Sequence, residues 1–193
     1  MGQRSQIYVR CSGNLIVANY YQWNFAERMI SRARWGIEEI DSVRQYGKSL
    51  RFDSAWWEKL CRVFDVNFDM HDYQIHSDII KEWEELFQNE PFNRFVFDEQ
   101  DNNNGQLIVD ISDNWEISYA FFSSDCTNRT PMSAAEYMRS ENSMWEQSKY
   151  IDEDGKKKCA ENIEAISKMA RLMTEQEVQD FLTYDYGYHP EKI

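Results

Sequence analysis

The chain has 193 residues, of which 42% are hydrophobic and 15% aromatic, and its 34 acidic against 21 basic side chains give a formal net charge of −13 at pH 7. This hydrophobic content excludes an intrinsically disordered acidic tail, and the length suffices to bury a core without a disulfide or a structural metal. Neither a secretory signal nor a run of about 18 apolar residues is present, so we expect one cytoplasmic domain over residues 1–193 with no membrane association.

The N-terminal segments predict a β-hairpin followed by a long helix. Residues 3–11 alternate polar and apolar, residues 12–14 (Ser-Gly-Asn) are typical of a turn, and residues 15–22 are rich in β-branched and aromatic side chains. After Asn24, a plausible helix cap, apolar residues recur at three- and four-residue steps to about residue 46. That spacing predicts one amphipathic helix over 25–46.

The middle of the chain predicts two helices and then strands. Helices are expected at 53–65 and from Ser77 to Pro91, where a proline ends the pattern. The period then changes from 3.6 to 2 over 94–99, 106–112 and 115–123, which predicts a three-stranded antiparallel meander.

The C-terminal third predicts three more helices. Ser133 should cap a short helix through Met138, and the acidic loop 151–155 leads into a helix that buries Ala160, Ile163, Ile166, Ala170 and Met173. Thr174 and Glu177 have capping-box spacing and should begin the last helix. The predicted fold class is therefore α+β: an N-terminal β-hairpin and a central antiparallel meander form a sheet covered by amphipathic helices.

Basic and aromatic side chains gather in the N-terminal third. Residues 1–51 carry a net charge of +4, whereas the remaining 142 residues carry −17. Arg28 and Arg32 lie one turn apart beside the apolar helix face, and Arg4 and Arg10 share strand parity. These arginines form either a site for an anionic partner or internal ion pairs. The aromatic residues Tyr20, Tyr21 and Trp23 either provide a stacking surface beside them or fill a corner of the core.

Several carboxylates are candidate catalytic groups. Glu58 follows two tryptophans, and Asp110 interrupts the pattern of a strand in a region that also holds Asp98, Glu99, Asp113 and Asp125. Paired acids on adjacent strands are one way in which nucleases hold Mg²⁺, although a solvated outer face is the simpler interpretation. The four cysteines are scattered, without metal-ligand spacing, and are expected to be reduced and mostly buried. We therefore expect no metal or other cofactor, apart from Mg²⁺ in the nuclease alternative.

The segments MGQRSQIYVR and ANYYQWNFAERMISRARWGIEEI resemble a family of small proteins from phages and mobile elements of Firmicutes. The resemblance is specific over about the first forty residues and extends more loosely to NNNGQLIVDI, EISYAFF and PMSAAEYM. Some proteins of this kind are anti-CRISPR proteins directed at type II-A effector nucleases. The resemblance implies an inhibitor in the cytoplasm of a bacterial host that blocks such a nuclease or compromises its guide RNA.

The charge distribution is compatible with either route. An acidic protein can compete with nucleic acid for a basic channel, and the N-terminal arginines could contact guide RNA. The favoured interpretation is a non-enzymatic inhibitor of a basic nucleic-acid-binding protein. Two alternatives stay open: a metal-dependent RNA nuclease that uses Glu58 or Asp110, and a protein that sequesters a small anionic defence signal.

Overall fold

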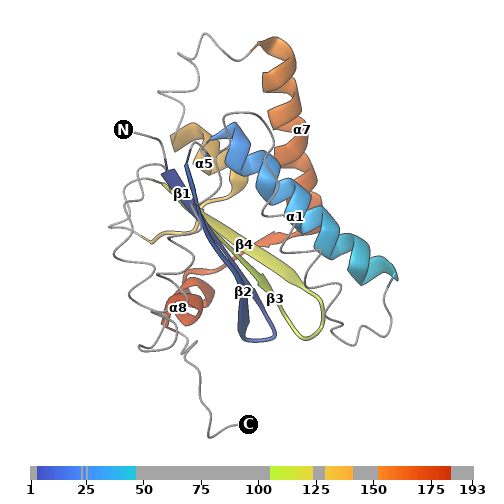
Figure 1. Cartoon of the computed structure of the whole chain (residues 1–193), viewed down its shortest axis with the longest axis vertical. Coiled ribbons are helices and arrows are strands. Elements are labelled where there is room, and N and C mark those ends of the chain that lie inside the picture. The colour runs from blue at the N-terminus through green and yellow to red at the C-terminus, as the bar shows by residue number, and fades with distance from the viewer. Residues whose placement is uncertain are drawn as a thin grey trace, which may run out of the picture.

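The fold is that of a computed structural model, which describes residues 4–22, 24, 26–46, 105–123, 129–140 and 152–183. A five-stranded sheet has the order β2-β1-β3-β4-β5 (Figure 1). Its strands are β1 (Arg4–Cys11), β2 (Asn14–Gln22), β3 (Gln106–Ile111), β4 (Ile117–Phe122) and β5 (Arg171–Leu172). The described helices are α1 (Glu27–Tyr46), α5 (Ala134–Ser140), α7 (Glu153–Met169) and α8 (Glu175–Thr183). The predicted α+β class is confirmed.

Two hairpins are joined by one parallel pairing. The predicted N-terminal hairpin β1–β2 is antiparallel and turns at Ser12 and Gly13, whose φ angles of 49° and 79° suit a tight turn. The strands β3 and β4 form the second hairpin, with its turn at Asp113–Asn114. Between the hairpins, β1 runs parallel to β3 with Gln6 opposite Gln106. The sheet is therefore mixed.

The predicted meander is only partly right. Its second and third strands are β3 and β4, whereas the segment 94–99 lies outside the described residues. The strand β3 is hydrogen-bonded to β1 on one edge and to β4 on the other over its whole length. Because a strand has only two edges, β3 has no place for the predicted third neighbour.

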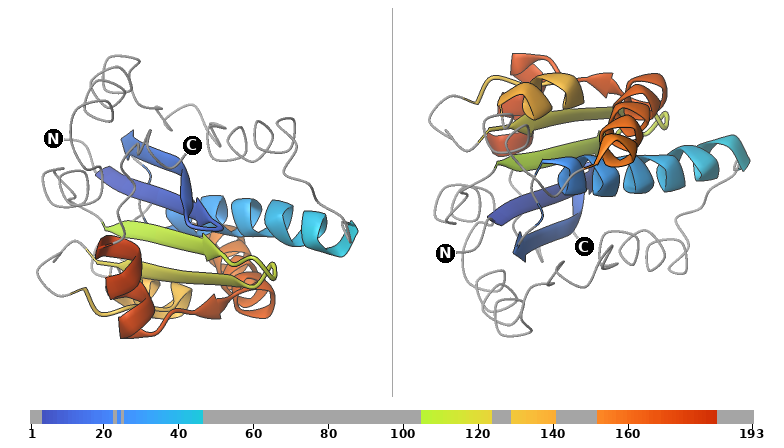
Figure 2. Two further views of the ribbon diagram at one scale, coloured as in Figure 1. Left: turned by 90° about the horizontal axis from the view of Figure 1, so that it is seen from below. Right: turned by 90° about the horizontal axis from the view of Figure 1, so that it is seen from above.

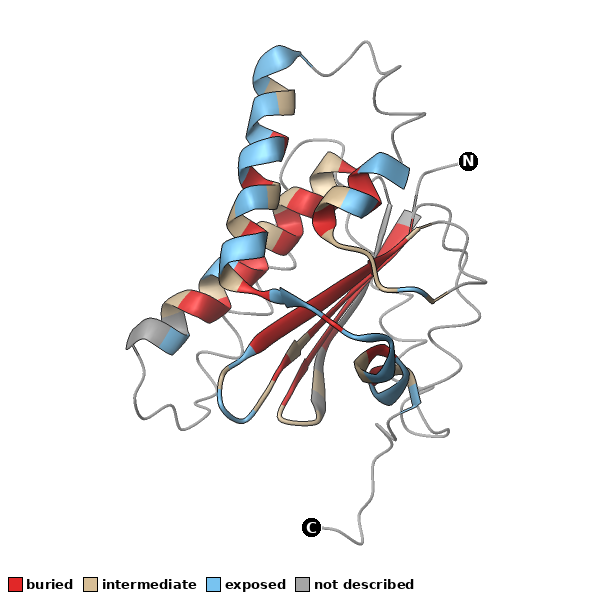
Figure 3. Ribbon diagram, turned by 180° about the vertical axis from the view of Figure 1, so that it is seen from behind, coloured by how far each residue is buried: buried red, intermediate tan, exposed pale blue. Residues whose placement is uncertain are grey.

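The helices lie on both faces of the sheet. Figure 2 shows α1, α5 and α7 on one face and α8 on the other. The larger core lies under α1, α5 and α7, where Ile7, Val9, Val109, Phe121 and other apolar strand residues are buried together with Met29, Ile37 and Ile166 of the helices. Outer faces of α7 and α8 are exposed, as Figure 3 shows in pale blue. No described helix combines the length and the apolar composition that crossing a bilayer requires.

Helix ends agree closely with the sequence pattern. The helix α1 begins at Glu27, two residues later than predicted. The helix α5 begins after its predicted cap Ser133, which forms a capping box with Glu136, and α8 begins at the predicted capping box Thr174–Glu177. Asn24 is not the cap of α1, because its side chain bonds Ser5 and Arg32. The helices predicted over 53–65 and 77–90 lie outside the described residues.

The helix α7 differs from its prediction in two respects. It begins at Glu153 within the predicted acidic loop, because the Asp152 side chain caps it by accepting from the Gly155 N–H at 2.8 Å. Its buried stripe includes Asn162 rather than Ala160, which is exposed. The Asn162 amide donates to the Ser31 hydroxyl of α1 at 3.2 Å, and a pattern of apolar residues alone does not reveal a polar contact of this kind.

Candidate functional site

Polar side chains gather on the face of the sheet that α8 covers, here called the α8 face. Successive strand residues point to opposite sides, so Gln6, Tyr8 and Arg10 lie opposite the core residues Ile7 and Val9. The parallel register places two further polar residues of β3 beside them, Gln106 next to Gln6 and Asp110 next to Arg10. The α8 face therefore carries buried polar groups between apolar ones.

Arg10 and Asp110 form a bidentate ion pair on this face. Arg10 Nε lies 2.8 Å from Asp110 Oδ1, and a terminal nitrogen of Arg10 lies 2.7 Å from Oδ2. Their side chains are only 11% and 24% exposed, and the Arg10 guanidinium carbon lies 4.6 Å from the ring centroid of Phe181 in α8. This arrangement ties β1, β3 and α8 together and supplies both partners with their counter-charge.

A second polar chain begins at Arg129, in the segment that follows β4. Its guanidinium donates to Gln106 Oε1 at 2.6 Å and lies 5.9 Å from the ring centroid of Phe122. The Gln106 amide in turn donates to Gln6 Oε1 at 2.6 Å, and both glutamines are fully buried. The bond to the buried Gln106 orients the Arg129 side chain.

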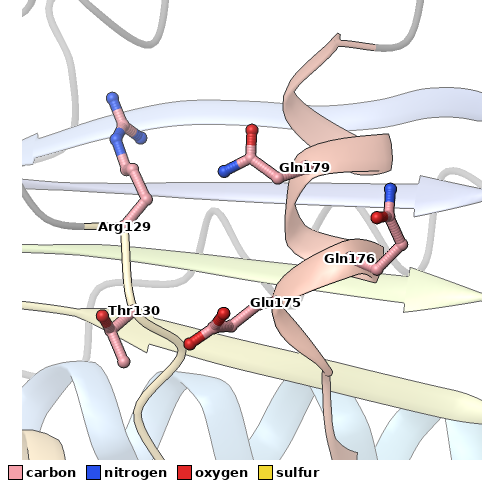
Figure 4. A pocket seen from close by; sticks show the side chains of 5 residues that line it. All are labelled: Arg129, Thr130, Glu175, Gln176 and Gln179. Atoms are coloured by element: carbon pink, nitrogen blue, oxygen red, sulfur yellow. The ribbon is translucent and has the colours of Figure 1, made fainter.

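An open cleft of about 300 Å³ lies between Arg129 and α8. Its described lining is entirely polar: Arg129, Thr130, Glu175, Gln176 and Gln179. In Figure 4 the Gln179 amide points from α8 toward the side of the cleft where Arg129 lies, and the Glu175 carboxylate points toward Thr130. The cleft can therefore offer hydrogen-bond donors, acceptors and both signs of charge to a polar molecule.

The predicted arginine site does not form as one surface. Arg10 lies on the α8 face, whereas Arg32 lies on α1, on the opposite side of the sheet. Arg32 is also completely buried, and its Nε donates to Asn24 Oδ1 at 3.1 Å. Because its guanidinium is buried, Arg32 does not contribute to an exposed surface in this structure, and its assignment as a binding residue stays a prediction. Arg10 instead follows the alternative interpretation, because it forms an internal ion pair with Asp110.

The other predicted binding residues are only partly described. Arg28 is half-buried on α1, and Arg4, Tyr20 and Tyr21 belong to the paired strands β1 and β2. Trp23 lies outside the described residues. Their role in binding stays a prediction.

The two candidate catalytic carboxylates also have different outcomes. Glu58 lies outside the described residues. Both carboxylate oxygens of Asp110 accept hydrogen bonds from Arg10. Within the described ranges, no three His, Cys, Asp or Glu side chains are grouped closely enough to hold a metal ion. The arrangement at Asp110 is that of a structural carboxylate, since its charge is already offset by a partly buried guanidinium.

Two of the four cysteines are described, and both are free and buried as predicted. Burial raises the pKa of the Cys11 thiol to about 11, with a smaller contribution from the negative charges of Asp110 and Asp113. Burial likewise raises the pKa of Cys159 to about 12, assisted by the charge of Glu27. Neither thiol is suited to nucleophilic chemistry at neutral pH, because the reactive form is the thiolate. Cys61 and Cys126 lie outside the described residues.

Most of the acidic excess falls outside the described residues. Among these residues 13 bases stand against 16 acids, a net of −3, so the rest of the chain has 8 bases and 18 acids, a net of −10. The segment 47–104, which connects α1 to β3, alone carries 13 acids and 6 bases. The described residues are thus close to neutral, and the segment 47–104 carries −7 of the formal net charge of −13.

Arg171 holds α8 against the end of β4. Its guanidinium lies 2.6 Å from a carboxylate oxygen of Glu116 and 2.6 Å from one of Glu177. Hydrogen bonds from Arg171 lower the pKa of Glu177 to about 2, and bonds from Thr174 add to this effect. The capping box of α8 and its ion pair therefore share one carboxylate.

This shared carboxylate predicts an acid-sensitive contribution to stability. The pKa of Glu177 falls from 4.5 to about 2 on folding, so its contribution is complete above pH 4.5 and is lost as the pH falls toward 2. Because the pair is partly exposed, we expect Glu177→Gln to lower the free energy of unfolding by less than about 1 kcal/mol near neutral pH. Urea unfolding of both proteins from pH 7 to pH 2 would measure the difference, which should disappear at the acid end. A difference that is constant across this range would contradict the assignment.

The residues of these contacts and of the cleft that sequence reasoning missed are Arg129, Gln106, Phe181, Arg171 and the exposed polar residues of α8. None belongs to a motif, and only the predicted amphipathic character of α8 indicated an exposed polar surface there. No family model matches the chain, and neither the curated proteins nor the solved structures contain a match to it.

Proposed function

We propose that the protein is a non-enzymatic inhibitor that binds the basic nucleic-acid channel of a type II-A RNA-guided nuclease. The observation that carries this proposal is the concentration of acidic side chains in the segment 47–104, next to a nearly neutral framework. The target class comes from the resemblance of the first forty residues to phage proteins that include inhibitors of these nucleases.

The electrostatics of such a target support this proposal. RNA-guided nucleases hold their heteroduplex and displaced strand in positively charged channels. An acidic segment would be drawn to such a channel and would compete there with phosphate groups. Charge-driven competition of this kind weakens as salt concentration rises.

The two alternative functions receive less support from the described residues. The nuclease alternative used Glu58, which lies outside the described residues, or Asp110, whose carboxylate is already paired with Arg10. The anionic-signal alternative used the helix arginines Arg28 and Arg32 with Arg4 and Arg10. Of these four, Arg10 is paired with Asp110 and Arg32 is buried. Neither observation concerns the acidic side chains of the segment 47–104, on which the inhibitor proposal rests.

A charge-reversal comparison tests the proposal. The variant Glu82→Lys, Glu84→Lys, Glu85→Lys changes three acids of the segment 47–104, and we expect it to weaken binding to a type II-A nuclease at least about tenfold. The control reverses three exposed acids of α7, Glu153, Glu161 and Glu164, which changes the net charge by the same amount. Affinity would be measured by interferometry at low and high salt, with and without guide RNA.

Three outcomes would count against the proposal. The absence of any complex, with or without guide RNA, would exclude this nuclease class as the target. Equal losses in the two charge-reversal variants would show that net charge, rather than the segment 47–104, determines affinity. Shortened guide RNA after incubation with Mg²⁺ would instead support the nuclease alternative.

A further inference from the structure

We propose that α8 is a hinged cover of the α8 face, which opens as a unit while the sheet and the helices on its other face stay folded. Among the described helices, α8 alone lies on this face (Figure 2). The proposal does not depend on the proposed inhibition, because it uses residues of the described strands and helices and none of the segment 47–104.

The apolar attachment of α8 is small. Of its nine residues, Val178 and Phe181 are the buried ones, and neither belongs to the large core cluster under α1, α5 and α7. Because the free energy of apolar burial follows the buried area, α8 is held far less firmly than the helices of that cluster. A nine-residue helix is also unstable by itself in water, so we expect α8 to lose its helical hydrogen bonds when it leaves the sheet.

The polar attachment of α8 lies at the surface. Arg171 joins Glu116, beside β4, to Glu177 in the first turn of α8, with a nitrogen–oxygen distance of 2.6 Å to each. The side chains of Arg171, Glu116 and Glu177 are 42%, 58% and 36% exposed. Exposed ion pairs contribute little free energy and are screened by salt. These three side chains, here called the Arg171 latch, therefore hold α8 weakly.

The hinge lies between Met173 and Thr174. The Met173 N–H donates to the Tyr119 carbonyl at 2.9 Å, and the Met173 side chain is buried, so the chain is fixed to β4 up to this residue. Thr174 is exposed and begins α8. Opening at this point leaves the pairing of β5 with β4 intact.

The contact beneath α8 does not prevent its opening. The Phe181 ring centroid lies 4.6 Å from the Arg10 guanidinium carbon, but both hydrogen bonds of Arg10 to Asp110 are formed between strands. That pair stays formed when Phe181 leaves, and the water that reaches it offsets part of the lost contact. Opening exposes Arg10 and also removes Gln176 and Gln179 from one side of the cleft. The position of α8 therefore controls access to both.

Hydrogen exchange of single amides, followed by NMR in increasing urea, tests the proposal. We expect the amides of 178–183 to exchange at least about 100-fold faster than those of β3 and β4, with one common opening constant. Their exchange should depend little on urea, since opening of one helix exposes little surface. Rates that increase gradually toward one end of α8 would show fraying and contradict opening as a unit. Exchange of α8 with the rates and urea dependence of β3 and β4 would show that it opens only by global unfolding.

Two variants test the Arg171 latch. We expect Arg171→Met to accelerate the exchange of α8 about threefold, because it removes both ion pairs. The control Lys168→Met removes an exposed ion pair with Glu164 of α7 and should leave the exchange of α8 unchanged. Added salt should accelerate the exchange of α8 in the wild type but not in Arg171→Met. Equal effects of the two variants on α8 would overturn the role of the latch.

A third variant separates opening of α8 from unfolding of the core. Ile166 is fully buried in the core cluster, and Ile166→Val should accelerate the exchange of β3 and β4 about threefold to tenfold. The exchange of α8 should not change, because Ile166 stays packed in both positions of α8. Equal acceleration of α8 and the strands would overturn the proposal. Binding to the nuclease does not enter any of these measurements, so the two proposals fail separately.

Discussion

Replacing Gly105 with alanine is expected to destabilise the protein by about 3 kcal/mol or more. Gly105 precedes β3 with a φ of +99°, a conformation that residues with a Cβ rarely adopt. An added Cβ would lie 2.0 Å from the Phe122 carbonyl oxygen and 3.1 Å from Tyr137 Cε2. The first neighbour is sheet backbone, which cannot move aside without disturbing the β3–β4 pairing. Urea unfolding monitored by circular dichroism would measure the change.

The matched control for this prediction is Gly155→Ala in the first turn of α7. Gly155 does not have a positive φ, and alanine is favoured over glycine by up to about 1 kcal/mol within a helix. We therefore expect this second glycine substitution to be neutral or stabilising. If the free energy of unfolding of Gly105→Ala lies within about 1 kcal/mol of the wild-type value, the close approach to Phe122 is not a constraint on the fold.

Replacing Asp110 with leucine is expected to cost about 3 kcal/mol, because it leaves the Arg10 charge partly buried without its carboxylate. The double variant Arg10→Met, Asp110→Leu should recover at least half of this loss, since it removes the unpaired charge as well. A double-mutant cycle of unfolding free energies would give the coupling between the two side chains. We expect a coupling of about 2 kcal/mol.

The control cycle uses Glu164 and Lys168 on α7. Their side chains are 65% and 70% exposed, and exposed pairs of this spacing couple by only about 0.3–0.5 kcal/mol. Similar couplings in the two cycles would show that the Arg10–Asp110 pair behaves as a surface pair and does not hold β1 to β3.

These two predictions affect how loss of function should be interpreted. Arg10 and Asp110 are attractive targets on sequence grounds, because one resembles an RNA contact and the other a catalytic acid. Their pairing means that substitutions at either position would reduce activity through loss of folded protein. Charge reversals in the segment 47–104 avoid the Arg10–Asp110 pair and therefore separate binding from stability more cleanly.

The local elements of this protein were readable from its sequence. Alternation over 3–11 and 15–22, with Ser12 and Gly13 between them, was sufficient for the N-terminal hairpin. The predicted cap Ser133 and the predicted capping box Thr174–Glu177 placed the starts of α5 and α8 correctly. Such features are local, because turn conformations and helix caps depend on side chains only a few residues apart.

The arrangement of these elements was decided by the tertiary structure. The parallel pairing of β1 with β3 joins residues 100 positions apart, and no local pattern distinguishes it from a meander in which 94–99 pairs with β3. This one pairing brings Asp110 beside Arg10 and Gln106 beside Gln6. The packing of α1 on the opposite face of the sheet separates Arg32 from Arg10.

Charge illustrates the same division between sequence and structure. The sequence determined how many acids and bases the chain has and that the acids are concentrated in the segment 47–104. Which charged side chains are buried in the fold depended on where α1 and α8 pack: Arg32 lies on the buried side of α1, and Arg10 is covered by Phe181 of α8. A side chain at the border of an apolar stripe can point either way, and only the packing of a distant element against it determines whether it meets solvent or protein.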